Sequence, residues 1–334
     1  MVLSEFSAYF HTQMKKLFSK ISLPLKILIS IGILALLYQK MDLDHLKQAL
    51  EKISLQAWGG AILLLLAQLF LQSLRWKYLI NVGQTRMTYP VALQVTLASH
   101  IANSLFIATI SGVVVRIAVA LQLGCSLFKA LFATAIDRVL TLASLVLLSA
   151  IFLPSLSHYI DVGAFKNISI LIGISIIMIF VITPFFALKI ITLTPEKIIS
   201  KANIVSGVRY LKILFSNNSL LLKILVISLM AQISFFIAIY IIMSAAGLAL
   251  SFIQIMTVLP AIAIVSSLPV SIGGWGIREG AFIYGLGLLN ISMETAFSAS
   301  VQIGILGLLA TVVAGAPALL WESEINLLKR YKKN

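Results

Sequence analysis

A succession of apolar runs close to twenty residues long constrains this chain more than any other feature. About 20 residues of α-helix cross the roughly 30 Å of hydrocarbon in a bilayer. After a short first run at 27–38, the apolar runs are 57–74, 91–110, 112–136, 139–156, 168–191, 220–243, 252–270, 281–291 and 296–321. Sixty per cent of the 334 residues are hydrophobic and 11% are charged, too few charges to cover a soluble domain. The sequence therefore predicts an all-α polytopic membrane protein.

The positions of lysine and arginine predict which way the runs cross. The formal net charge is +14, and the cations gather in short segments between the runs. Because cytoplasmic segments carry the excess of Lys and Arg, we expect the N-terminus, 75–86, 189–223 and the C-terminal tail inside, and 39–56 and 157–167 outside. Both termini are then cytoplasmic. This placement favours anionic headgroups, and not nucleic acid, as the partner of the basic residues.

Three segments make up the predicted domain organisation. Residues 1–22 show a helical apolar stripe with lysines beside it, which predicts an amphipathic helix on the cytoplasmic face, with a frayed polar leader as the alternative. Residues 23–325 form a single transmembrane domain. Its first run is retained as an anchor, because no A-x-A cleavage site follows it. Residues 326–334 are a basic cytoplasmic tail.

Two regions, 91–138 and 252–291, are not clean spans. Ser111-Gly112 and Arg116 interrupt the first, and we expect Pro260, Pro269 and a group of glycines to break the helix in the second. The charge assignment makes the first region enter and leave on the cytoplasmic side and the second on the outer side. Each is either two full helices or a re-entrant hairpin.

The order span, interrupted region, span therefore occurs twice, in opposite directions. This order is typical of inverted-repeat transporters, whose broken helices meet near the midplane and bind substrate there. The sequence predicts about seven full transmembrane helices plus two oppositely oriented re-entrant hairpins.

In the second interrupted region a group of glycines precedes an Arg–Glu pair: Gly273, Gly274, Gly276, Arg278 and Glu279. The glycines allow a tight turn at membrane depth, and the pair opens the next helix. An intramembrane arginine is costly and is a functional candidate by default. Beside a helix N-terminus its flat guanidinium suits phosphate or carboxylate oxygens. Glu279 is a counter-ion, a proton carrier or a structural partner, and an Arg–Glu lock of the hairpin is the alternative.

The first interrupted region has matching chemistry. Its candidate binding residues are Asn103, Ser111, Arg116, Asp137 and Arg138. Apolar residues flank Arg116, so we expect it to line a cavity. Asp137 and Arg138 stand before the next run and are either cavity residues or interfacial anchors.

Arg75-Trp76 follows the run 57–74 and is interpreted as an interfacial anchor. His100 lies in an apolar helix and is expected to be packed and hydrogen-bonded.

The sequence has none of the usual marks of catalysis. It contains no G-x-S-x-G, no P-loop and no H-E-x-x-H, and its histidines and Cys125 form no ligand spacing. A dinucleotide loop at the glycines would need a βαβ unit, which the pattern does not provide. We therefore expect no catalytic residue, metal or cofactor.

At the residues singled out above, the chain resembles the lysylphosphatidylglycerol synthase transmembrane family, also described as the flippase-like domain family. Its motif L-P-x-S-x-G-G-x-G-x-R-E-G is matched from Leu268 to Gly280. The resemblance extends to Arg75-Trp76, Asn103, Arg116, the L-G-C-S stretch at 123–126 and Asp137-Arg138. The chain departs from it at 111–113, Ser-Gly-Val where members often have Gly-Gly-Asp, and at Asp137, where they often have Glu.

The resemblance implies a lipid-handling domain in the cytoplasmic membrane of a bacterium or archaeon. In bifunctional members this domain precedes a soluble aminoacyltransferase, and since this chain stops at Asn334 we do not expect the synthase activity. The implied function is binding and transbilayer movement of an anionic phospholipid or a polyprenyl-phosphate-linked lipid.

Arg278 and Arg116 would hold the phosphate in a central cavity, with backbone N–H groups from the turn at 273–276 and Glu279 balancing the charge. The alternative is a membrane subunit or enzyme that assists aminoacyl or glycosyl transfer with a separate synthase or transferase.

Overall fold

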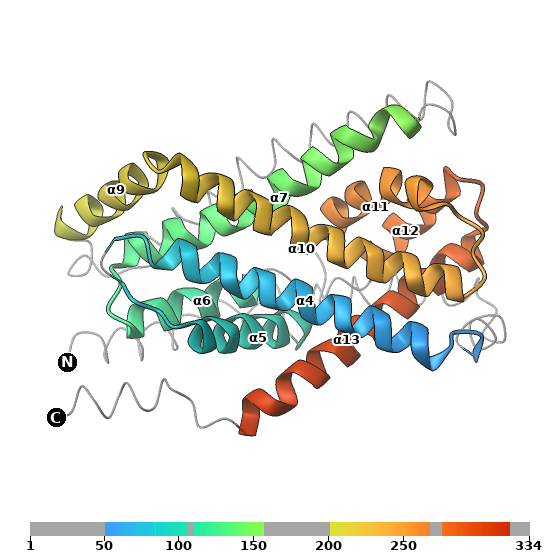
Figure 1. Ribbon diagram of the computed structural model, residues 1–334, viewed down its shortest axis with the longest axis horizontal. Helices are drawn as coiled ribbons and strands as arrows, with labels where there is room; N and C mark the ends of the chain where they lie inside the picture. Colours follow the sequence, from blue (N-terminus) through green and yellow to red (C-terminus); the bar gives the residue numbers. More distant parts are fainter. Residues whose placement is uncertain (1–50, 84, 106–109, 157–200, 268–275, 321–334) are drawn as a thin grey trace, which may run out of the picture.

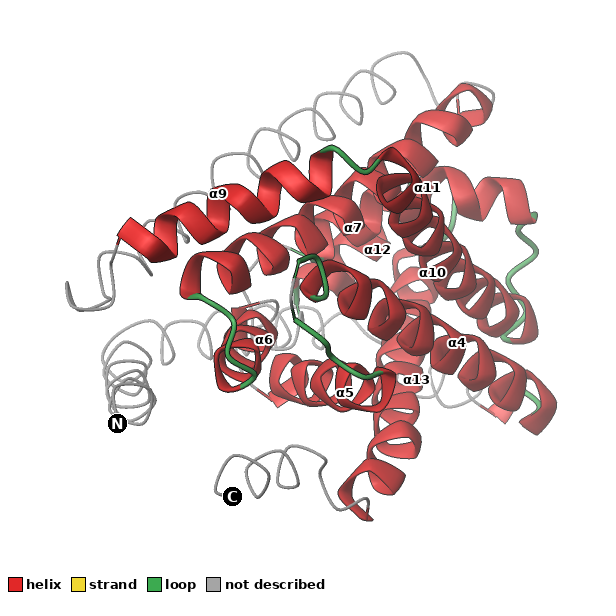
Figure 2. Ribbon diagram, turned by 60° about the vertical axis from the view of Figure 1, so that its left-hand side comes forward, coloured by secondary structure: helices red, strands yellow, loops and turns green. Residues whose placement is uncertain are grey.

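The computed structural model describes residues 51–83, 85–105, 110–156, 201–267 and 276–320, and these residues form helices and their connections without any strand (Figures 1 and 2). The helices are α4 Leu55–Ile80, α5 Tyr89–Leu105, α6 Ile110–Gln122, α7 Leu127–Leu156, α9 Lys201–Phe215, α10 Asn218–Ala245, α11 Phe252–Ser266, α12 Ile277–Gly287 and α13 Met293–Leu320. The predicted helix in 1–22, the runs 27–38 and 168–191 and the tail lie outside the described residues.

Four of the described helices are long and apolar enough to cross a membrane. They are α4, α7, α10 and α13, with candidate spans Leu55–Ile80, Leu127–Phe152, Asn218–Ala245 and Met293–Ala314. Their mean hydropathy runs from 1.7 in α4 to 2.4 in α10. The prediction of an all-α polytopic membrane protein is thus confirmed.

The described helices follow the pattern long, short, short, long twice. In the first half α4, α5, α6 and α7 have 26, 17, 13 and 30 residues. In the second half α10, α11, α12 and α13 have 28, 15, 11 and 28 residues. The two short pairs occupy the interrupted regions of the sequence, and their re-entrant character stays a prediction.

The two halves run in opposite directions. The central helices α4 and α10 pack along each other and are antiparallel (Figure 1). Ala61 and Leu65, early in α4, share a core with Ala238 and Ile242, late in α10. The short pairs lie in opposite halves of the molecule in Figure 1. Each pair also packs against the long helix of the other half, α5 on α13 and α11 on α7. This arrangement agrees with the inverted order expected from loop charges.

The predicted boundary at Asp137-Arg138 is wrong. The chain breaks earlier, between Gln122 and Leu127, and α7 runs without interruption through both charged residues. Gly124 ends α6 in the left-handed conformation at φ +83°, where glycine is the usual helix terminator. Its amide donates to the carbonyl of Leu121, 3.0 Å away. Asp137 can lie in the middle of a membrane helix because two buried arginines pair with its carboxylate, as described below.

The expectation that Pro260 breaks the helix of the second region is also wrong. Pro260 is buried in the middle of α11, which starts at a reciprocal Ser251–Gln254 cap and continues to Ser266. Membrane helices tolerate proline where neighbouring groups compensate for the missing backbone hydrogen bond. The other predicted breaker, Pro269, lies outside the described residues.

Candidate functional site

The first charge cluster consists of Arg75, Arg116 and Asp137. Arg75 Nε donates to Asp137 Oδ1 at 2.8 Å, and Arg116 Nη1 donates to Oδ2 of the same carboxylate. The side chains are 3%, 4% and 2% exposed and come from α4, α6 and α7. One carboxylate therefore joins three helices through two buried ion pairs.

Arg75 is the residue in this cluster that sequence reasoning missed. Its Nη1 donates to Ser228 Oγ at 3.0 Å, and its Nη2 donates to Thr141 Oγ1 at 2.8 Å, so it also reaches α10. Trp76 is fully buried, with the Arg116 guanidinium 5.1 Å from its ring centroid. The interpretation of Arg75-Trp76 as interfacial anchors is therefore wrong.

The first cluster carries more positive than negative charge. Two guanidinium groups face one carboxylate, which leaves a formal surplus of one positive charge. Arg116 Nε is buried and has no hydrogen-bond partner among the described residues. Arg138, the next residue on α7, is partly buried. A surplus of buried positive charge is expensive unless an anion or polar groups approach it.

Asn103 and Ser111 lie where α5 crosses α6. Asn103 Oδ1 accepts a hydrogen bond from the Gly112 amide at 2.7 Å, and Ser99 Oγ donates to the Gly112 carbonyl at 3.2 Å. A Cβ at Gly112 would lie 2.8 Å from Asn103 Nδ2 and 3.0 Å from the Ser99 carbonyl oxygen. The crossing thus requires glycine, and Asn103 holds the start of α6, with the buried Ser111 beside it.

The second cluster is built on the first turn of α12. Glu279 is fully buried, and its Oε2 accepts from the amide of Gly276, whose φ of +91° favours glycine. Its Oε1 accepts from Arg278 Nε at 3.1 Å, from Arg278 Nη2 at 2.6 Å and from Ser300 Oγ at 3.2 Å. A carboxylate at this position satisfies a free amide and complements the helix dipole. Glu279 therefore fixes both the turn and the arginine.

Arg278 lies against α13. A Cβ at Gly304 would meet its Nη2 at 2.5 Å and its Nη1 at 2.9 Å, so the guanidinium packs on the bare backbone of that helix. The side chain keeps 16% exposure, four times that of Arg116. Ser300 and Gly304 were not predicted, and their spacing of four on one helix face was the only signal.

The two predicted phosphate ligands both lie in the second short helix of their half, Arg116 in the middle of α6 and Arg278 in the first turn of α12. In the sequence each arginine stands four residues after a glycine, Gly112 and Gly274. Among the described residues, however, the two clusters have no member in common. Gly273 and Gly274 lie outside the described residues.

His100 Nε2 lies 2.9 Å from Gln72 Oε1, which confirms the expected packed and hydrogen-bonded histidine.

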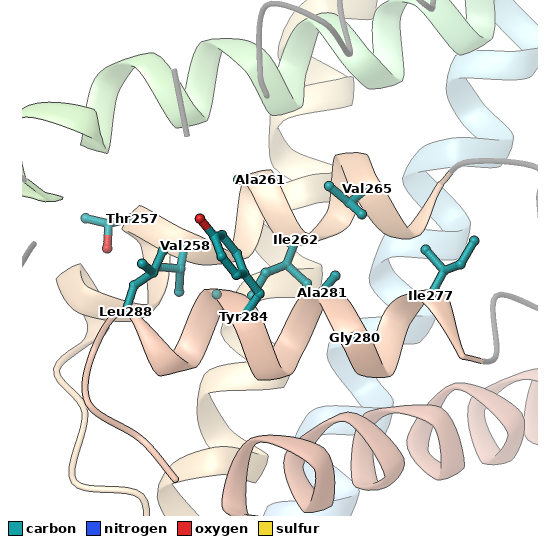
Figure 3. Close-up of a pocket in the computed structure, with 11 residues that line it drawn as sticks. Thr257, Val258, Ala261, Ile262, Val265, Ile277, Gly280, Ala281, Tyr284 and Leu288 are labelled. Carbon is teal, nitrogen blue, oxygen red and sulfur yellow. The ribbon is translucent and has the colours of Figure 1, made fainter. Parts of the chain in front are cut away.

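An apolar groove of about 530 Å³ lies between α11 and α12 (Figure 3). Its lining residues are Thr257, Val258, Ala261, Ile262 and Val265 from α11, and Ile277, Gly280, Ala281, Tyr284, Gly285 and Leu288 from α12 and its C-cap. Arg278 does not line it but follows Ile277 directly.

Comparison with known proteins supports the resemblance. The profile of the family described as "Lysylphosphatidylglycerol synthase TM region" matches residues 24–315, which include both charge clusters and the groove. No curated protein matches the chain. Because the match covers most of the sequence, the chain belongs to the lysylphosphatidylglycerol synthase transmembrane-region family.

Proposed function

We propose that this protein binds an anionic or phosphate-bearing lipid or glycolipid and moves its headgroup between the leaflets. Membership of the family supports a membrane domain related to lipid handling. The observation that carries the finer proposal is the position of Arg278, a partly exposed guanidinium deep in the second short pair. Arg278 is the proposed phosphate contact.

The depth of Arg278 follows from the helices around it. The end of α12 at Gly287 is close in sequence to Met293, where a candidate span begins, so this end lies near the membrane surface. Gly287 is nine positions after Arg278, which corresponds to about 14 Å of helix at 1.5 Å per residue. Half of the hydrocarbon thickness is about 15 Å. Arg278 is then near the bilayer centre, where a phosphate otherwise has no polar partner.

The local arrangement suits a phosphate. Arg278 stands in the first turn of α12, where backbone N–H groups and the helix dipole attract anions. Glu279 balances the charge of Arg278 when no lipid is present. Its Oε1 accepts from both Arg278 and Ser300, and the guanidinium packs on Gly304, so α13 fixes the orientation of Arg278. The surplus charge of the first cluster adds a positive potential in the opposite half of the molecule.

The orientation is proposed from the basic residues. The C-terminal end of α4, the helix α9 and the start of α10 lie at the same end of the molecule (Figure 1). These elements carry Lys77, Arg209, Lys212 and Lys223, and Lys223 Nζ lies 4.4 Å from the centroid of the Tyr78 ring. By the positive-inside tendency this end faces the cytoplasm. The C-terminal end of α10, the start of α11 and the end of α12 then face the outer leaflet.

The test is lipid mass spectrometry of the protein extracted into native nanodiscs, comparing wild type with Arg278→Gln. Arg209→Gln removes an exposed arginine of α9 and is the matched control. We expect one anionic lipid class to be enriched in wild type and in the control, and lost in Arg278→Gln. Equal enrichment in all three would contradict Arg278 as the phosphate contact. Bulk-like lipid in all three would favour a membrane subunit that assists a separate synthase.

A further inference from the structure

We infer that the groove between α11 and α12 binds one acyl chain of a phospholipid of the outer leaflet, with the chain end at Ile277 and the ester end at Leu288. The inference rests on the proposed function for the identity of the cargo and for the assignment of the leaflet. In this register the phosphate lies at the outer end of the groove, about 16 Å of helix from Arg278, so the groove holds the lipid in the outer leaflet before its phosphate moves inward to Arg278.

The lining of the groove has the chemistry of a hydrocarbon site. Its polar side-chain atoms are the hydroxyl groups of Thr257 and Tyr284, and the remaining lining residues are aliphatic or glycine. In Figure 3 the Tyr284 side chain extends from α12 toward α11 along one side of the space. Tyr284 is 52% exposed and Ile253 of α11 is 50% exposed, so this face of the pair is turned outward. In a membrane protein an outward apolar face meets lipid tails.

Two glycines of α12 give the groove its shape. At Gly285 the helices approach so closely that a Cβ would lie 2.6 Å from Ile262 Cδ1 and 2.7 Å from its Cγ1. At Gly280, more than one helical turn earlier, a Cβ would meet nothing within 4 Å. The space beside Gly280 is therefore open because this residue has no side chain. An unfilled apolar space loses dispersion contacts, and an acyl chain from the adjacent leaflet restores them.

The length of the groove matches one leaflet. It runs along the 11 residues of α12, which is about 16 Å of helix. One leaflet contributes about 15 Å of hydrocarbon. The outer end at Leu288 lies near the membrane surface, and the inner end at Ile277 is adjacent in sequence to Arg278. A polyprenyl chain is much longer than this space, so an acyl chain is the better match.

The register of the chain is tested by photo-crosslinking in proteoliposomes. Two phosphatidylglycerol probes are used, one with a diazirine near the ester and one with a diazirine at the end of the acyl chain. We expect the first probe to label peptides at Tyr284 and Leu288, and the second to label Val265 and Ile277. The reverse order, or equal labelling of the whole outer face by both probes, would overturn the inference. Preferential labelling by a polyprenyl phosphate probe would overturn the choice of an acyl chain.

The second test fills the groove with a side chain and asks whether the acyl chain is excluded. Gly280→Phe places a ring in the open space, while Gly287→Phe adds the same ring at another exposed glycine of α12 with nothing within 4 Å. We expect Gly280→Phe to lower groove labelling about tenfold, and Gly287→Phe to leave it unchanged. Equal labelling in both variants would overturn the site.

The two proposals fail in different ways. If Arg278→Gln stops lipid movement while the ordered labelling of the groove is absent in wild type, the proposed function stands and the groove assignment is wrong. If the ordered labelling is present but Arg278→Gln leaves lipid enrichment and movement intact, the tail site stands and the phosphate assignment is wrong.

Discussion

The two charge clusters differ in how far apart their charged residues are in the sequence. Arg75, Arg116 and Asp137 come from three helices, and the cluster is almost completely buried. Arg278 and Glu279 are neighbours on one helical turn, and the guanidinium keeps 16% exposure. The first cluster therefore joins three helices and reaches a fourth through Ser228, whereas the second joins α12 to α13 and leaves its guanidinium partly exposed. The partners of an intramembrane arginine thus decide how far it is accessible to a ligand.

The largest expected effect comes from the carboxylate of the first cluster. Asp137→Asn leaves two buried guanidinium groups without a counter-ion, and breaking a buried ion pair costs roughly 3–5 kcal/mol. We expect unfolding in mild detergent, followed by denaturant titration, to show a loss of this size. A loss below about 1 kcal/mol would mean that the first cluster does not hold the helices together, and the contrast between the clusters would break down.

The crossing that positions Arg116 is the next most sensitive point. Gly112→Ala pushes a methyl group against Asn103 and the Ser99 carbonyl, one of which is rigid backbone. Overpacking of this kind costs about 1–3 kcal/mol. Gly60→Ala is the matched control, because a Cβ there meets nothing within 4 Å. Thermal unfolding of the two variants compares them directly, and equal melting temperatures would contradict the close α5–α6 crossing.

The carboxylate of the second cluster is expected to matter less than Asp137 for stability. Glu279→Gln keeps an oxygen that can accept from the Gly276 amide, and only one guanidinium, which stays bonded to Ser300, loses its counter-ion. We expect a loss of about 1–2 kcal/mol, the usual scale for a weakened buried hydrogen bond. The same denaturant titration used for Asp137→Asn measures it. A loss as large as that of Asp137→Asn would show that both clusters serve the same structural purpose.

The smallest effect on stability is expected at Gly304. Gly304→Ala places a Cβ against the flexible end of Arg278, which can shift, so the free energy of unfolding should change by less than about 1 kcal/mol. Lipid enrichment should nevertheless fall, because the guanidinium is displaced from its position on α13. Gly307→Ala has open space at its Cβ and should leave enrichment unchanged. Unchanged lipid enrichment in both variants would show that lipid binding does not depend on the position of the Arg278 guanidinium on α13.

Hydropathy and the Leu268–Gly280 motif were sufficient for the helical class, the family and the location of both short pairs. They failed at Arg75 and at Asp137-Arg138. A hydropathy pattern counts each charge as a reason to end a span, whereas Asp137 remains inside because it pairs with Arg75 and Arg116, which are 62 and 21 positions away in the sequence. Such pairings depend on how helices pack, which a single sequence does not reveal. Ser300 and Gly304 were missed because small residues in an apolar run leave no charge or turn signal.

The proposed phosphate contact is tested most directly by the rate of lipid movement in proteoliposomes. Fluorescent phosphatidylglycerol in the outer leaflet is followed by chemical quenching, with equal amounts of folded wild type, Arg278→Gln and the Arg209→Gln control. Loss of one charge-assisted hydrogen bond of about 1.5–3 kcal/mol predicts that Arg278→Gln moves lipid roughly 10- to 100-fold more slowly. The control should match wild type. Equal rates for Arg278→Gln and wild type would contradict Arg278 as the phosphate contact.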